Sequence, residues 1–419
     1  MDGFTTKQFY PLRPIQRWLV DTHFNKAKST MMNIGGLFKL SVKIDLQRFV
    51  DALNEVLNAH DIFRCRFVFH PETSDLCQIF DGDIDPVKIS RMSDEAFDSH
   101  MAKLREPYRI INKPLWRMYV IETPTARYFY ADFYHAIMDG VASSILCLRE
   151  IEKVYRGRTV NRPALSYAEY VDEEAHLTPE DLAEAHDYWR KMLAPFDKSK
   201  HLPPIDVEGV AAWTQGNVEY TFKNFTEEFF RNTGRSENTF FLAATMMTLA
   251  KVTRSNEAIM SWIHNGRTNM RERRLMGLML EQFPCAWNFS EDITVGDFLD
   301  RLEGQIRMST KYRKGLDMVY NDGLEDDCVS FIFQKGINND PIFCDTTMET
   351  IYLPPNEISA VENALDVEVE AKDDGTYDVF LDYDASRYSE AAIENFAKIM
   401  NKILIAMRDV DARISTIIA

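Results

Sequence analysis

A histidine and an aspartate–glycine pair stand close together in the stretch YFYADFYHAIMDGVASS, residues 128–144. His135 ends a run of alternating polar and aromatic side chains, and Asp139 and Gly140 follow four and five positions later. Successive side chains of a strand point to opposite faces, so His135 shares a face with apolar neighbours while Tyr134 points the other way. A neutral imidazole at the end of such a strand can accept a proton near pH 7.

The chemistry that this spacing offers is general-base catalysis, which typically contributes about 10²- to 10⁴-fold to a rate. Asp139 can fold back, or pair with a distant arginine, and so fix the loop that carries His135. The alternative is a structural histidine that happens to precede a turn. Spacing alone leaves both interpretations open.

Length and charge set the first limits on function. A chain of 419 residues exceeds what one hydrophobic core usually organises, so we expect two lobes. The net charge of −17 argues against non-specific binding of nucleic acid. Basic clusters at 265–275 and 311–314 are expected to be solvated faces, with contact to a phosphate or an acidic partner as the alternative.

The sequence lacks the motifs of several metal-binding, catalytic and targeting classes. The six cysteines have no CxxC or zinc-ligand spacing, which favours reduced thiols in a cytoplasmic protein. The loop at 81–86 begins like a calcium site, but Pro86 and Met92 replace the required glycine and glutamate, so we expect no metal. No signal peptide, GxSxG elbow, dinucleotide fingerprint or P-loop is present. The apolar stretch 239–250 is too short to cross a bilayer and predicts a buried helix.

Both halves of the chain mix helical stripes with alternating strands. We predict helices at 44–59 with Asp45 as N-cap, at 145–155 closed by Gly157, at 239–252 and after Ser389, and strands at 63–69, 116–122, 127–135, 258–264 and in a hairpin over 365–384. Surface helices and a proline-bearing stretch fill the middle. We therefore expect an N-terminal α/β lobe at 1–165, crossover helices at 166–210 and a C-terminal α/β lobe at 211–419.

The stretch around His135 resembles the HHxxxDG motif of the condensation domains of nonribosomal peptide synthetases, within the chloramphenicol-acetyltransferase-like superfamily. His135 matches the second histidine, Asp139 and Gly140 match the DG, and Tyr134 stands where the family has its first histidine. Six further segments resemble family segments in the same order: 10–19 (YPLRPIQRWL), 57–67, 113–120, 170–193, 264–287 and 380–396. Within 264–287, Glu281 and Gln282 replace the usual Asn-Thr.

The resemblance implies an α/β fold of two chloramphenicol-acetyltransferase-like sandwich lobes that form a V with a central tunnel. It also implies that donor and acceptor carrier proteins bring their substrates as thioesters on phosphopantetheine arms. The acceptor's amine would attack the donor's thioester, and an amide would form. No tightly bound cofactor is expected, and positioning two tethered ends in a dry tunnel would supply much of the acceleration.

The resemblance assigns roles to the residues of the motif. His135 would orient the amine and accept its proton, and a backbone N–H near Gly140 would help to stabilise the oxyanion. Asp139 would form a salt bridge to an arginine from the other lobe, with Arg267 the best candidate. Arg64 is a weaker candidate for the same network.

Three positions are less constrained by the resemblance. Tyr134 points away from His135, so we expect it to serve packing. Ser143 and Glu281 are expected to line the substrate tunnel. For Glu281 the favoured alternative is a solvated edge residue.

Alternatives to a condensing domain remain at this stage. One is a first-position domain that attaches a fatty acyl group to an amino acid, and another is a free-standing acyltransferase that uses coenzyme A or one carrier. A third is a condensation-like module that recruits partners without catalysis. In each case we expect a cytoplasmic monomer without a nucleic-acid or membrane partner.

Overall fold

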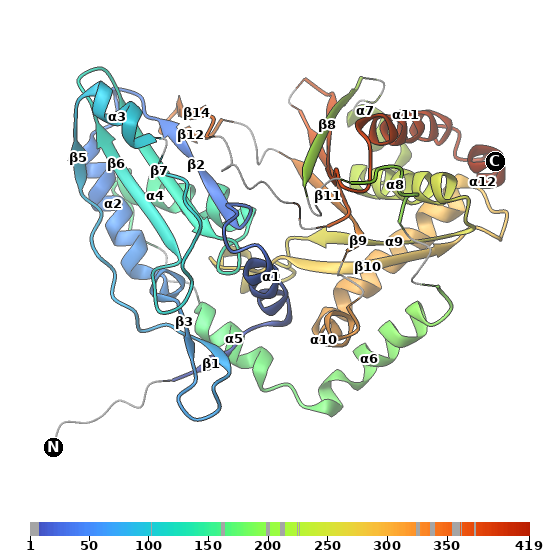
Figure 1. The fold of residues 1–419 in the computed structure, drawn as a ribbon, viewed down its shortest axis with the longest axis horizontal. Helices are drawn as coiled ribbons and strands as arrows, with labels where there is room; N and C mark the ends of the chain where they lie inside the picture. The colour runs from blue at the N-terminus through green and yellow to red at the C-terminus, as the bar shows by residue number, and fades with distance from the viewer. Residues whose placement is uncertain are drawn as a thin grey trace. The chain divides into compact units, whose positions relative to one another are not determined.

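The computed structural model describes residues 8–419 apart from 102, 161–163, 198–201, 210–213, 224, 226, 324–326, 336–339, 354–360, 362 and 373 (Figure 1). Contacts divide the chain into two units. Unit 1 comprises Met1–Leu177, Arg267–Leu280 and Asn339–Ser359, and unit 2 comprises Thr178–Gly266, Glu281–Asn338 and Ala360–Ala419.

The two units differ from the continuous ranges expected from the sequence, because Arg267–Leu280 and Asn339–Ser359 pack with the N-terminal half. The expected crossover at 166–210 is also divided, since its first helix belongs to unit 1 and its second to unit 2. Residues 198–201 and 210 of that crossover lie outside the described residues.

Unit 1 is built on a five-stranded sheet in the order β14-β2-β7-β6-β5 and a small sheet in the order β1-β4-β3. Its strands are β1 (Tyr10–Pro11), β2 (Asn33–Lys39), β3 (Arg66–Phe69), β4 (Leu76–Ile79), β5 (Ile89–Arg91), β6 (Trp116–Glu122), β7 (Arg127–Tyr134), β12 (Ile342–Phe343), β13 (Thr346–Thr347) and β14 (Glu349–Ile351). Its helices are α1 (Pro14–Asn25), α2 (Leu46–Ala59), α3 (Asp94–Met101), α4 (Leu148–Tyr155) and α5 (Tyr167–Ala175). The predicted strands at 116–122 and 127–135 thus form the hairpin that ends at the motif.

Helix α2 shows why local pattern predicts this unit well. Asp45 caps it by accepting a hydrogen bond from the Arg48 backbone N–H at 3.1 Å, as predicted. Its apolar stripe is buried, and Phe49 meets Phe129 of β7 edge to face at 5.1 Å. On the other sheet face, Phe97 of α3 stacks on Tyr128 at 3.9 Å. Alternation along β7 therefore directs its two faces toward different helices.

Unit 2 is built on a six-stranded sheet in the order β10-β9-β11-β15-β16-β8. Its strands are β8 (Gln215–Phe222), β9 (Glu257–His264), β10 (Glu281–Asn288), β11 (Val329–Lys335), β15 (Leu365–Ala371) and β16 (Tyr377–Asp384). Its helices are α6 (Pro179–Leu193), α7 (Glu227–Thr233), α8 (Glu237–Thr253), α9 (Val295–Lys311), α10 (Asp317–Asn321), α11 (Glu390–Ala406) and α12 (Ile414–Ile418). Pro284 is tolerated in β10 because this strand lies at the sheet edge.

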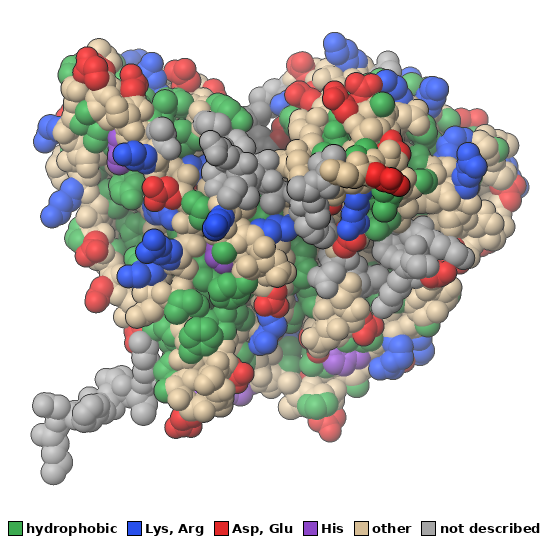
Figure 2. Space-filling view, in the orientation of Figure 1, with side chains coloured by type: hydrophobic (Ala, Val, Ile, Leu, Met, Phe, Trp, Pro, Cys, Tyr) green, Lys and Arg blue, Asp and Glu red, His purple; other side chains and the backbone are tan. Residues whose placement is uncertain are grey.

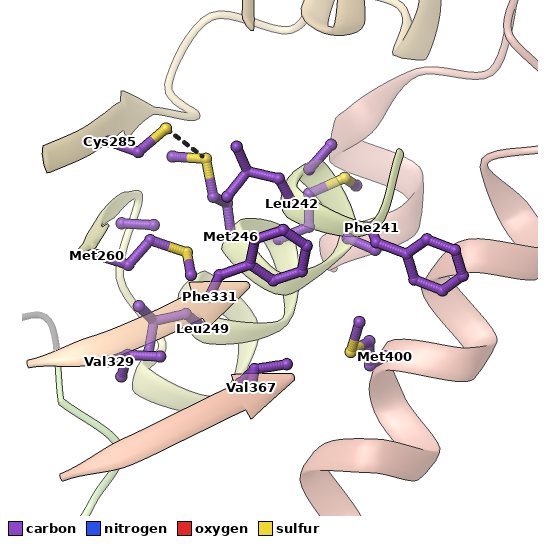
Figure 3. Close-up of a cluster of buried hydrophobic side chains, with 14 of the residues drawn as sticks. Phe241, Leu242, Met246, Leu249, Met260, Cys285, Val329, Phe331, Val367 and Met400 are labelled. Carbon is purple, nitrogen blue, oxygen red and sulfur yellow. Dashed lines mark hydrogen bonds between the residues drawn. The ribbon is translucent and has the colours of Figure 1, made fainter. Parts of the chain in front are cut away.

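Helix α8 forms the centre of unit 2, and every residue from 239 to 250 is buried. Figure 3 shows Met246 and Leu249 of α8 among Phe331 of β11, Val367 of β15 and other apolar side chains. A helix that is apolar on all sides is stable only when it is covered on all sides. The prediction of a buried helix here is confirmed, as are the hairpin over 365–384 and the Ser389 cap of α11.

Both units are mixed α/β structures, as the sequence predicts. Their arrangement as a V with a central tunnel stays a prediction. In the part of the chain that the structure describes, no helix is both long and apolar enough to cross a membrane. Figure 2 shows acidic and basic side chains interspersed on the visible surface of each unit.

Gly277, in the segment that joins unit 1 from far along the sequence, provides a test of this packing. Its φ is +144°, and an added Cβ would lie 2.2 Å from Cδ2 of Tyr167 on α5. We expect Gly277→Ala to lower the free energy of unfolding by about 3 kcal/mol or more, because backbone strain and a clash combine. Denaturant titration measures the change.

Gly157→Ala is the matched control in the same unit. Gly157 has a φ of +81°, but its added Cβ would meet nothing closer than Arg48 Nη2 at 3.7 Å. This variant should therefore lose only about 1 kcal/mol for the left-handed backbone. Equal losses in the two variants would show that Tyr167 does not pack against Gly277 as described.

Candidate active site

His135 directly follows the last residue of β7 and is half-buried. Its backbone N–H donates to the Met32 carbonyl at 2.9 Å. Its ring Nδ1 lies 3.1 Å from the Met138 carbonyl oxygen. Because a carbonyl can only accept, this contact assigns the ring proton of the neutral imidazole to Nδ1 and leaves the lone pair on Nε2. The ring therefore has the tautomer that a general base needs.

The turn after His135 is tightly bonded within itself. The backbone N–H of Ile137 donates to the Tyr134 carbonyl at 3.0 Å, and that of Met138 to the His135 carbonyl at 3.3 Å. Gly140 then caps a π-helical stretch, η2 (Val141–Cys147), which continues into α4. The predicted helix is thus confirmed from Leu148 to Tyr155, with a wider first turn of the kind often found at functional sites.

Asp139 is held by a buried ion pair. Its Oδ2 lies 2.9 Å from Arg267 Nη1, and the two side chains are only 5% and 4% exposed. The same oxygen accepts from the backbone N–H groups of Met279 and Leu280, while Oδ1 accepts from that of Ala142 at 2.8 Å. The predicted pairing of Asp139 with Arg267 is therefore present.

The position of the segment that carries Arg267 corrects one part of that prediction. Arg267 was expected to come from the other lobe, whereas Arg267–Leu280 packs in unit 1 with Asp139. Arg267 also donates through Nη2 to the carbonyls of Leu275 and Gly277, both at 3.1 Å. The segment returns to unit 1 because its backbone and its arginine both bind one buried carboxylate.

The prediction that Arg64 takes part in this network is wrong. It ends a short 3₁₀ turn, where it donates to the Gly82 carbonyl at 3.3 Å and to Asn58 Oδ1 at 3.1 Å. These contacts hold the loop before β5 against α2 instead. The 3₁₀ turn at Asp61–Arg64, which the sequence pattern does not reveal, gives the Arg64 side chain these partners in place of Asp139.

The remaining sequence candidates have defined surroundings. Tyr134 is buried and meets the rings of His23, Phe67 and Tyr108, which fits the packing role expected for it. Ser143 is buried in η2, and its hydroxyl donates to the Gly140 carbonyl at 3.3 Å. These contacts leave its role in a substrate tunnel a prediction.

Glu281 begins β10 in unit 2, opposite His264 of β9. It is 5% exposed, so the interpretation as a solvated edge residue is wrong. Burial, with a smaller contribution from Arg313, lowers the pKa of the neighbouring His264 to about 4. The alternative role for Glu281, in a substrate tunnel, stays a prediction.

A further buried carboxylate near the motif, Asp132, is not predicted from the sequence. It lies on β7 on the same face as Tyr134, and it accepts from Asn33 Nδ2 at 2.9 Å and from Arg117 Nη1 at 3.1 Å. Burial raises the pKa of Asp132 to about 6, against the opposing effect of Arg117. The only sequence signal was a charged residue on an otherwise aromatic strand.

Three cations of the basic clusters are paired with carboxylates. Arg267 binds Asp139, Arg271 lies 2.8 Å from Glu173, and Lys311 lies 3.3 Å from Glu184. Among the described residues, no group of three or more His, Cys, Asp or Glu side chains is arranged to hold a metal ion. Burial raises the pKa of the Cys147 and Cys285 thiols to about 12.

Removing the guanidinium of Arg267 should be costly. Arg267→Met leaves the Asp139 carboxylate buried without its counter-charge, and we expect the free energy of unfolding to fall by about 3–5 kcal/mol. The control is Arg271→Met on the same segment, which breaks an ion pair whose side chains are about half exposed and should change the free energy of unfolding little. Denaturant titration distinguishes them, and similar losses would contradict the buried clamp.

Asp132 makes the stability of the chain depend on pH. Its folded-state pKa of about 6 lies above its ordinary value of 3.8, so its contribution is most favourable below pH 4 and is lost as the pH rises through 6. Relative to Asp132→Asn, the parent should lose roughly 2 kcal/mol of unfolding free energy between pH 4 and pH 7. Urea titrations across this range measure it, with the exposed Asp98→Asn as control. A flat difference for Asp132→Asn would contradict the raised pKa.

Comparison with known proteins agrees with this geometry. The sequence model of the condensation domain family matches residues 6–417. Tyrocidine synthase 3 of Brevibacillus parabrevis is 22% identical over 284 residues, which is 65% of this chain and 4% of that protein. This chain therefore spans only a small fraction of the length of that relative.

Solved structures show the same fold. The condensation domain of the Monacolin K polyketide synthase MokA superposes with a TM-score of 0.79 at 18% identity, over 97% of this chain and 99% of that one. A mutant of the starter condensation domain of rhizomide synthetase RzmA, in complex with C8-CoA and Leu-SNAC, gives a TM-score of 0.73 at 13% identity, over 97% of this chain and 96% of that one. With the family match across almost its whole length, this chain belongs to the condensation domain family.

Proposed function

We propose that this chain forms an amide bond between a thioester-bound acyl or aminoacyl donor and the amine of an aminoacyl acceptor on a carrier protein. Family membership supports the reaction class, because condensation domains catalyse amide formation between carrier-bound substrates. The observation that carries the proposal for this chain is the Nδ1 contact of His135 with the Met138 carbonyl. That contact leaves Nε2 able to take a hydrogen bond from an attacking amine.

The chemical step asks for position more than for strong catalytic groups. The amine nitrogen bonds to the thioester carbonyl carbon, and the C–S bond breaks. His135 Nε2 accepts the proton that the amine loses and returns one to the departing thiolate, so the histidine ends as it began. A thioester is already activated, so alignment of the two reactants contributes much of the acceleration.

The surrounding turn fits this task. Asp139 and Arg267 hold the far end of the turn, so that the Met138 carbonyl stays in place to orient the imidazole. We assign the backbone N–H of Gly140, at the start of η2, to the oxyanion that develops on the thioester carbonyl. Ser143 and Glu281 are assigned to the walls of the substrate passage, and Tyr134 to packing behind β7.

The partners follow from this chemistry. Donor and acceptor carrier proteins would supply phosphopantetheine thioesters, with coenzyme A as the smallest equivalent of the donor arm. The complex of the rhizomide starter domain with C8-CoA supports an N-acylating starter as the specific form of the proposal. A free-standing acyltransferase differs only in taking a soluble amine or alcohol as acceptor.

His135→Ala tests the proposal. We expect amide formation between a loaded donor and a loaded acceptor carrier to fall by about 10²- to 10⁴-fold. Intact mass spectrometry of the acceptor carrier, loaded with different amino acids and offered several acyl donors, measures the product. His176→Ala, which changes an exposed histidine at the end of α5, is the control and should keep the parental rate.

The outcomes separate the alternatives. Turnover of acyl-coenzyme A with a soluble amine, in the absence of any carrier, would favour the free-standing acyltransferase. If His135→Ala leaves product formation unchanged, the histidine has no catalytic role. If the parent forms no product but binds a partner enzyme, the recruiting module replaces the condensing domain.

A further inference from the structure

Two buried glutamines hydrogen-bond to each other beside the turn that follows His135. Gln16 on α1 and Gln78 on β4 are both fully buried. Gln16 Nε2 donates to Gln78 Oε1 at 3.1 Å, and Gln78 Nε2 donates back to Gln16 Oε1 at 2.8 Å. Such a pair stabilises two amides away from water only when their remaining donors and acceptors are also satisfied.

The outer contacts of the pair fix its orientation. Gln16 Nε2 donates to the Ala136 carbonyl at 2.9 Å, and Gln78 Nε2 donates to the Pro11 carbonyl at 2.8 Å. Gln16 Oε1 also accepts from the Arg13 backbone N–H at 3.0 Å. Flipping either amide would place an oxygen against a carbonyl oxygen, so only one orientation satisfies every group.

The contact with Ala136 links this pair to the chemistry. Ala136 directly follows His135, within the same turn as the Met138 carbonyl that accepts from the imidazole. We propose that Gln16 and Gln78 are positioning residues for His135, in which Gln16 holds the Ala136 carbonyl and Gln78 holds Gln16. The inference rests on the proposed role of His135 as the acceptor of the amine's proton.

The pair complements the Asp139–Arg267 clamp. The ion pair holds the turn at its end, whereas the amide pair holds it one residue after the histidine. With one contact missing, the turn can shift and move Met138 relative to the ring. A displacement of about 1 Å at a reacting group can cost about 100-fold in rate, so the loss should appear in kcat.

A double-mutant cycle tests the relay from Gln78 through Gln16. Gln16→Leu should lower kcat for amide formation by about 10- to 100-fold, with little change in KM for the acceptor carrier. Gln78→Leu should lower kcat by a smaller factor. Because Gln78 acts through Gln16, the double variant should match Gln16→Leu within about two-fold. Gln47→Leu, which changes an exposed glutamine bonded to Asp51 on α2, is the control and should keep the parental kcat.

The tautomer of His135 gives a readout that does not depend on activity. Nitrogen-15 histidine spectra of the parent, assigned with His135→Ala, should show the proton of the neutral ring on Nδ1. In Gln16→Leu and Gln78→Leu this population should fall, whereas Gln47→Leu should leave it unchanged. If Gln16→Leu fails to fold, Gln78→Met, which is unbranched and similar in length, provides the same comparison.

Distinct results would overturn the inference and the proposed function. Parental kcat and an unchanged His135 tautomer in the folded glutamine variants would overturn the positioning role. Full additivity of the two kcat losses would overturn the relay. If instead the parent forms no amide while the tautomer still responds to Gln78, the pair positions His135 but the proposed reaction is wrong.

Discussion

The buried ion pair between Asp139 and Arg267 is the interaction on which the candidate site depends. A carboxylate with almost no exposed surface is unstable unless its charge and its lone pairs are satisfied. Asp139 meets this condition with one guanidinium and three backbone N–H groups, two of them from Met279 and Leu280. The requirement of one side chain therefore brings a segment from far along the sequence back to the turn that follows His135.

The turn held by the Asp139–Arg267 ion pair also orients the imidazole of His135. The Met138 carbonyl in this turn sets the tautomer of His135, so the orientation of the imidazole depends on backbone geometry rather than on another side chain. The geometry also explains why Tyr134 can stand where the family motif has its first histidine. The Tyr134 side chain lies among the rings of His23, Phe67 and Tyr108, where it contributes packing.

The neutral amide pair and the charged pair act on the same turn by different physics. The ion pair is strong but costly to bury, and the amide pair is weaker but fully satisfied without net charge. Asp132 is a buried carboxylate on β7 itself, and its raised pKa reflects burial that Arg117 only partly offsets. The strand that leads to His135 is thus held by polar contacts on one face and by aromatic packing against α2 on the other.

Much of the fold could be predicted because helices, strands and caps are set by local periodicity. The sequence by itself determined the α2 and α11 caps, the hairpin that ends at His135, the buried α8 and the partnership of Asp139 with Arg267 through the family motif. Only the tertiary structure decided which unit holds Arg267, the orientation of the His135 ring, the burial of Glu281 and the pairing of Gln78 with Gln16. The reason is separation along the chain: Gln16 and Gln78, for example, lie 62 positions apart. No local pattern encodes contacts over such distances, since they arise only when the packed backbone brings the groups together.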